Sequence, residues 1–90
     1  MRKIERTSQF KKDVKRYQKN LDKMAKLVEV VTMLQNEVPI PPKMRPHRLI
    51  GNYSGCMECH IGSDFLLVWL DEVNDVVRLV RLGSHSELFG

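Results

Sequence analysis

The sequence has no apolar run long enough to span a bilayer, and its first ten residues, MRKIERTSQF, carry charge from the second position onward. Such a start lacks the apolar segment of a secretory signal. We therefore expect a cytoplasmic protein with no membrane partner. In that compartment its two cysteines, Cys56 and Cys59, should stay reduced.

The sequence is also poor in metal-binding patterns. CMECH at 56–60 has the spacing of a haem-attachment site and of half a zinc site, but no second C-x-x-C is present. On a strand, Cys56 and Cys59 would project to opposite faces, so we interpret both as buried free thiols. No acidic cluster suits magnesium either. We expect no metal and no other cofactor.

The positive charge is uneven along the chain. Residues 1–48 contain thirteen Lys or Arg against five Asp or Glu, whereas residues 49–90 contain two against six. With a net charge of +4, this asymmetry favours RNA, DNA or an acidic protein as partner over a neutral metabolite. A solvated basic helix is the simpler alternative.

Ninety residues predict a single domain, 1–90, and apolar spacing predicts its first half. RKIER is a short strand candidate, with Thr7 or Ser8 as the cap of a following helix. Steps of three and four then predict a helical hairpin, whose second helix runs from Leu21 to about Glu37. The predicted apolar stripe comprises Phe10, Val14, Tyr17, Leu21, Met24, Leu27, Val28, Val31 and Leu34.

The second half changes to strand patterns. All four prolines fall within 39–46, which predicts an extended crossover. HRLIG is short, CMECHI alternates, FLLVWL is a buried strand, DEVND a turn and VVRLVRL a last strand before the tail GSHSELFG. The predicted class is α+β: an N-terminal strand and helical hairpin packed on an antiparallel C-terminal sheet, β-α-α-β-β-β with a possible extra strand.

Alternation along 57–61 places His60 opposite a core face formed by Met57, Cys59 and Ile61. A three-residue connection, 62–64, would pair Ile61 with Phe65. A two-residue turn at 62–63 would instead set His60 and Asp64 on opposite faces. The sequence leaves both arrangements open.

The three histidines suggest acid–base chemistry. His47, His60 and His85, with Asp64 and Arg81, supply proton-exchanging groups and a phosphate-neutralising cation. On RNA, a base can deprotonate the 2′-hydroxyl for attack on phosphorus while an acid protonates the departing 5′-oxygen. That reaction needs no metal. Three imidazoles are equally compatible with a metal site.

RPHRLIG, CHIGSDFLLVW and VRLGSHSELFG together resemble the RelE/ParE superfamily of bacterial toxins, most closely its YafQ-like branch. The resemblance covers nearly the whole chain and implies a RelE-like fold. It implies a toxin of a type II toxin–antitoxin system, an endoribonuclease that cuts messenger RNA in the ribosomal A site and is restrained by an antitoxin.

Position by position, the resemblance implies that the active-site residues are His47, His60, Asp64, Arg81 and His85. His85 would be the general acid, Asp64 or His47 the general base, His60 would position the phosphate, and Arg81 would stabilise the transition state. An RNA-binding set would consist of Phe65, which replaces a tryptophan common in relatives, and Phe89, Lys11, Lys12, Lys15, Arg16 and Lys19.

The implied partners are a cognate antitoxin, messenger RNA and the ribosome with its 16S rRNA, and operator DNA only through the antitoxin complex. Three alternatives stay open: a ParE-like gyrase poison, a non-catalytic module that binds nucleic acid or an acidic partner, and a metal-binding protein.

Overall fold

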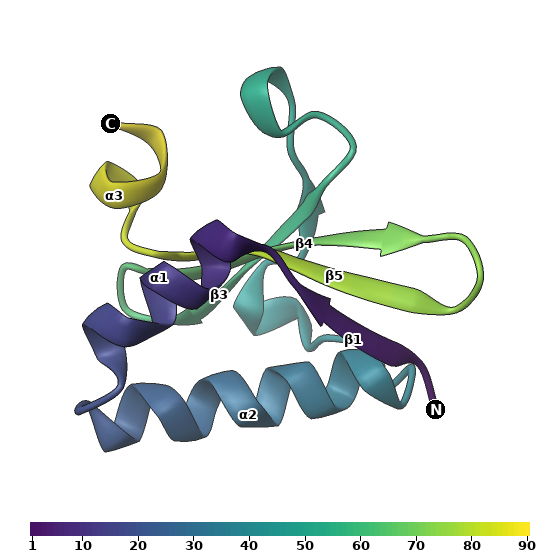
Figure 1. Ribbon diagram of the computed structural model, residues 1–90, viewed down its shortest axis with the longest axis horizontal. Coiled ribbons are helices and arrows are strands. Elements are labelled where there is room, and N and C mark those ends of the chain that lie inside the picture. Colours follow the sequence, from purple (N-terminus) through teal and green to yellow (C-terminus); the bar gives the residue numbers. More distant parts are fainter.

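The computed structural model describes residues 1–90 as one mixed five-stranded sheet with helices on its two sides (Figure 1). The predicted α+β class is confirmed, and β2 is the extra strand. None of the helices has the length and apolar character needed to cross a membrane. The elements in chain order are β1 (Lys3–Arg6), α1 (Ser8–Tyr17), α2 (Leu21–Gln35), η1 (Pro42–Met44), β2 (His47–Arg48), η2 (Gly51–Tyr53), β3 (Met57–Gly62), β4 (Phe65–Glu72), β5 (Val76–Gly83) and α3 (His85–Phe89).

The strand order is β1-β5-β4-β3-β2. β1 pairs in parallel with β5, and the remaining pairs are antiparallel. The helical hairpin between β1 and β2 therefore carries the chain from one sheet edge to the other, and the C-terminal strands fill the space between them.

Both long helices begin at polar caps. Thr7 accepts a hydrogen bond from the Phe10 N–H, and Asn20 accepts one from the Lys23 N–H. The predicted stripe needs two corrections: Leu21 is 79% exposed because it is the first residue of α2, and Val28 is 64% exposed. Val30 takes the core position instead, fully buried.

The two faces of the sheet are covered differently. α2 lies along one face, while α3 and η2 lie on the other (Figure 1). Cys59 belongs to the larger core beside α2, and Cys56 to the smaller cluster beside Leu88, so the two thiols do lie on opposite faces. Burial raises the pKa of both, that of Cys59 to about 12.

The β3–β4 hairpin differs from both sequence alternatives. Its turn is Ser63–Asp64, Phe65 pairs with Gly62 rather than Ile61, and the register shifts between His60 and Gly62. The irregularity lets Ile61 and Phe65 both enter the core. His60, opposite Leu66, stays on the other face, as predicted.

The C-terminal tail forms the short helix α3, which the sequence analysis leaves as an irregular tail. Its cap is a capping box: the Ser84 side chain accepts from the Glu87 N–H, and the Glu87 carboxylate accepts from the Ser84 N–H. Gly83 makes room for this contact, because a Cβ there would lie 2.6 Å from Glu87 Oε1. The cap fixes His85 as the first residue of the helix.

Candidate active site

Three segments bring the three histidines together on the face of the sheet opposite α2. The ring centroids of His47 and His60 are 6.3 Å apart, and those of His60 and His85 are 5.7 Å apart. They come from β2, β3 and the start of α3. Phe89 continues the row, with its ring 6.1 Å from that of His85.

Asp64 orients His85. Its Oδ1 accepts the backbone N–H of His85 at 2.9 Å and lies 3.2 Å from the ring Nδ1. Because a carboxylate only accepts, Nδ1 carries the proton, and in the neutral ring the lone pair is on Nε2. The hydrogen bonds from the His85 backbone and side chain lower the pKa of Asp64 below its ordinary value.

Glu58 belongs to the candidate site, although it was not predicted from the sequence. Its side chain is only 3% exposed, Oε1 lies 3.2 Å from His47 Nε2, and Oε2 has no hydrogen-bond partner. His47 Nδ1 lies 2.7 Å from the Arg45 carbonyl, which can only accept, so Nδ1 donates there. In the neutral ring, the lone pair is then on Nε2, beside the Glu58 carboxylate. The alternation that places His60 on this face places Glu58 there too, and this was the available signal.

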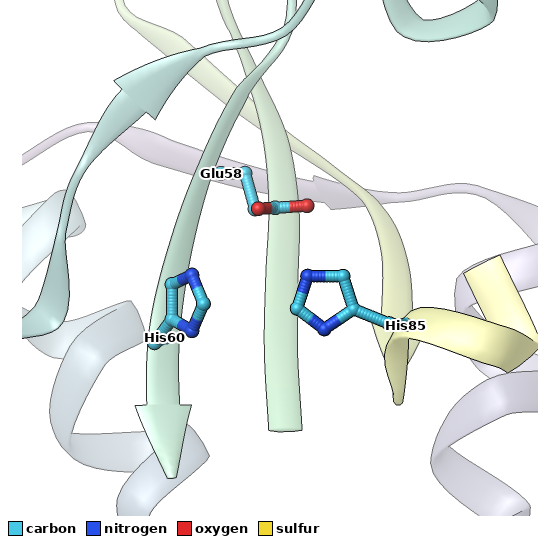
Figure 2. A group of neighbouring side chains, drawn as sticks. All are labelled: Glu58, His60 and His85. Carbon is cyan, nitrogen blue, oxygen red and sulfur yellow. The ribbon is translucent and has the colours of Figure 1, made fainter. Parts of the chain in front are cut away.

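Glu58, His60 and His85 form a compact group of possible metal ligands. One ligand atom from each lies within 4.8 Å of the others. Figure 2 shows the rings of His60 and His85 facing each other with the Glu58 carboxylate beside both. These are the side chains that could hold a metal ion.

Arg81 lies on the same face, where it is held by two partners. On the sheet it pairs with Val68, whose other neighbour is Glu58. Its Nε donates to Asp13 Oδ2 at 2.8 Å and its Nη1 to the Tyr53 hydroxyl at 2.8 Å. The hydrogen bond to Asp13 raises the pKa of Arg81 above its ordinary value. Asp13 and Tyr53 have no sequence signal that marks them as part of a site.

The RNA-binding set is only partly available at the surface. The prediction for Phe65 is wrong: it is fully buried, and its ring packs 4.8 Å from that of Tyr17 in the core. Phe89 is 47% exposed and meets Tyr53 edge to face. Arg16 is bound to the carboxylates of Asp13 and Glu87. The four lysines of the set are exposed: Lys11, Lys12, Lys15 and Lys19.

The sheet order, the helical hairpin and the C-terminal histidine together define a toxin with the RelE/ParE-like fold of type II toxin–antitoxin systems. A family model described as "Bacterial toxin of type II toxin-antitoxin system, YafQ" matches residues 2–90. The chain belongs to the YafQ family.

Individual relatives are similar to this chain over nearly their whole length. The mRNA interferase toxin YafQ of Escherichia coli K12 is 36% identical over 90 residues, covering 99% of this chain and 97% of that protein. A metal-bound toxin from Helicobacter pylori is 42% identical and superposes with a TM-score of 0.88, covering 99% of this chain and all of the other. YafQ in the E. coli DinJ–YafQ complex is 35% identical, with a TM-score of 0.85 over the full length of both.

Proposed function

We propose that this protein is an endoribonuclease that cleaves messenger RNA by attack of the ribose 2′-hydroxyl on the adjacent phosphorus. The observation that carries the proposal is the row of three imidazoles beside two carboxylates, Glu58 and Asp64, on one side of the sheet. The likeness to the E. coli mRNA interferase supports the same substrate. A gyrase poison would not need this proton-transfer set.

His85 serves as the general acid. With Nδ1 donating to Asp64, the exposed Nε2 can carry a second proton and deliver it to the departing 5′-oxygen. The Asp64 carboxylate stabilises the imidazolium that this requires. Asp64 is thereby engaged, so of the two candidates for general base, the geometry favours His47.

His47 Nε2 lies 3.2 Å from Glu58 Oε1 and, because Nδ1 donates to the Arg45 carbonyl, carries the lone pair of the neutral ring. That lone pair can accept the 2′-hydroxyl proton, and the Glu58 carboxylate stabilises the imidazolium that results. His60, between His47 and His85, is placed to hold the phosphate, and Arg81 supplies positive charge for its developing negative charge. The products are a 2′,3′-cyclic phosphate, which water can open to a 3′-phosphate, and a free 5′-hydroxyl.

The proposed partners follow from charge and from the relatives. The exposed lysines of α1 and of the turn after it offer a surface for the phosphates of ribosomal RNA, and Phe89 offers a ring on which a base can stack. The E. coli relative forms a complex with the antitoxin DinJ. We propose that a cognate antitoxin restrains this chain in the same way.

The test is cleavage of a defined messenger RNA, free and on programmed ribosomes, by the wild type and the His85→Ala variant, with EDTA in the free-RNA reactions. We expect wild-type cleavage with cyclic or 3′-phosphate ends, and none by the variant. No cleavage in either setting by a folded protein that still arrests growth would overturn the proposal in favour of a gyrase poison.

We infer a second property from Glu58, whose buried Oε2 has no hydrogen-bond partner and whose carboxylate lies close to ring nitrogens of His60 and His85. A carboxylate and two imidazoles suit zinc, copper or nickel. Two H. pylori relatives are described as metal-bound and copper-bound. A divalent transition metal held by these three side chains would be a Lewis acid, and the imidazole lone pairs would no longer be available for proton transfer. We therefore expect the metal to inhibit.

Calorimetric titration of the metal-free protein with Zn²⁺ tests this without RNA. We expect one ion per chain, with binding lost in His60→Ala and retained in Cys59→Ala, because Cys59 lies on the opposite face. Equal binding by wild type and His60→Ala would place the metal elsewhere and contradict the inference.

A further inference from the structure

Asp13 is a fully buried carboxylate on α1, and the proton transfers described above do not use it. Burying a charge is costly unless the group is paired. Asp13 is paired extensively: it accepts from Arg81 Nε at 2.8 Å, Arg81 Nη2 at 3.3 Å and the Leu82 N–H at 2.9 Å. Gln9 at 3.1 Å and Arg16 at 2.7 Å complete its surroundings. These bonds outweigh burial and lower the pKa of Asp13.

The carboxylate sits where β5 loses its strand partner. β1 pairs with β5 only as far as Leu79, and beyond that point α1 supplies the hydrogen-bonding groups. The Thr7 hydroxyl donates to the Val80 carbonyl, and Asp13 accepts from the Leu82 N–H. Asp13 thus replaces the strand that would otherwise satisfy this edge.

The same stretch contains a register shift that decides where Arg81 points. Trp69 pairs with Leu79 and Val68 pairs with Arg81, so Val80 is an extra residue in β5. In a regular strand, Arg81 would share the core face of Leu79. The bulge turns Arg81 to the opposite face, beside Val68, where the histidines lie.

One carboxylate therefore fixes both features: the backbone just after the bulge and the guanidinium that the bulge redirects. Of the five N–H groups of Arg81, two bond to Asp13 and one to Tyr53. Two N–H groups on the terminal nitrogens are left for another acceptor. One of them is on Nη1 and the other on Nη2.

We propose that Asp13 is a positioning residue for the cleavage reaction: it holds Arg81 so that its two remaining N–H groups meet the scissile phosphate. This rests on the proposed function. Because Asp13 also offsets the charge of Arg81, its contribution is to geometry rather than to attraction of RNA. Removing the charge of Asp13 should slow the chemical step without weakening RNA binding. If Asp13 only stabilised the fold, its loss would instead reduce the amount of folded protein and leave the rate of each folded molecule unchanged.

The matched pair of variants is Asp13→Asn and Glu5→Gln. Each substitution removes one negative charge that contacts an arginine of β5. Glu5, however, contacts Arg78, which lies near the start of β5, whereas Arg81 lies near its end. Single-turnover cleavage at saturating enzyme reports the chemical step. Affinity is measured on RNA with a 2′-deoxy residue at the mapped cleavage site, after fold and stability of each variant are recorded by circular dichroism.

We expect Asp13→Asn to cleave about 10- to 100-fold more slowly, as for a misplaced catalytic group, while its RNA affinity stays equal or rises. Glu5→Gln should cleave at the wild-type rate. A folded Asp13→Asn protein with the wild-type rate overturns the positioning role alone. Failure of the wild type to cleave any RNA, free or on ribosomes, overturns the proposed function and this role with it.

A measurement on the wild type covers the case in which Asp13→Asn fails to fold. In protein labelled with ¹⁵N-arginine, the Nε–H of Arg81 should exchange with water much more slowly than that of Arg48, because Arg81 is 16% exposed and bonded to Asp13, while Arg48 is exposed. Equal exchange rates would show that Asp13 does not hold the guanidinium, which would overturn the proposal.

Discussion

Neighbouring residues of β3 have opposite surroundings. Cys59 is fully buried in the core beneath α1 and α2, whereas His60, the next residue, lies on the face that α3 and η2 cover only in part. On that face His47 is 46% and His85 59% exposed, although Glu58 beside them is almost fully buried. Alternation along the strand therefore places residues that stabilise the fold on one face and the proposed catalytic residues on the other. Substitutions on the two faces should have separable effects.

The largest effect is expected on the open face. Replacing His85 with Ala removes the proposed general acid, and we expect a loss of about 100- to 10,000-fold in cleavage rate. Because the ring is more than half exposed, the thermal unfolding midpoint should change little. Cleavage assays and calorimetric melting on the same preparation measure both. A stable variant that cleaves at the wild-type rate would remove His85 from the mechanism.

On the face of the sheet that packs against α1 and α2, we expect substitutions to lower stability without changing RNA binding. Phe65→Ala deletes a fully buried ring and should cost about 3–5 kcal/mol of unfolding free energy. RNA affinity of the folded fraction should not change, since the ring reaches no surface. Phe89→Ala is the matched control: it should leave stability nearly unchanged and weaken RNA binding by about 1–3 kcal/mol. The reverse outcome would contradict the separation of the two faces.

The contribution of Asp13 to the stability of the fold should depend on pH. Its pKa in the folded protein is lowered, so its contribution to stability is complete above about pH 4, the ordinary range of aspartate, and is lost as pH falls through the folded value. Urea unfolding at pH 7, 4 and 3 should therefore show a steeper loss in the wild type than in Asp13→Asn. Parallel curves would contradict this. Apolar contacts such as those of Phe65 do not titrate.

The smallest effect is expected from the cysteines. Cys56→Ser with Cys59→Ala should retain cleavage, because neither thiol lies among the side chains proposed to transfer protons, and should lose on the order of 1 kcal/mol of stability per site. Inactivity of a folded double variant would show that the CMECH segment has a chemical role of its own. Cleavage and urea unfolding measure the two quantities.

Local patterns were sufficient for most of the fold. Helical spacing located the hairpin, although the buried stripe shifted from Val28 to Val30. The short helix α3 was missed, even though Ser84 and Glu87 form the S-x-x-E pattern of a capping box, because five residues are too few to show a helical period. The prediction for position 65 came from the resemblance, in which an aromatic often follows the aspartate, whereas the turn directs Phe65 into the core.

The sequence by itself determined the order of the elements, the opposite placement of Cys59 and His60, and the identity of the three histidines, because these follow from residue type and short-range periodicity. The tertiary structure decided which groups assist them. Arg81 reaches the site only through the bulge at Val80, and Glu58 gains its pairing with His47 only when β2 lies beside β3. Such contacts join residues far apart along the chain, and their protonation depends on burial, which periodicity does not report.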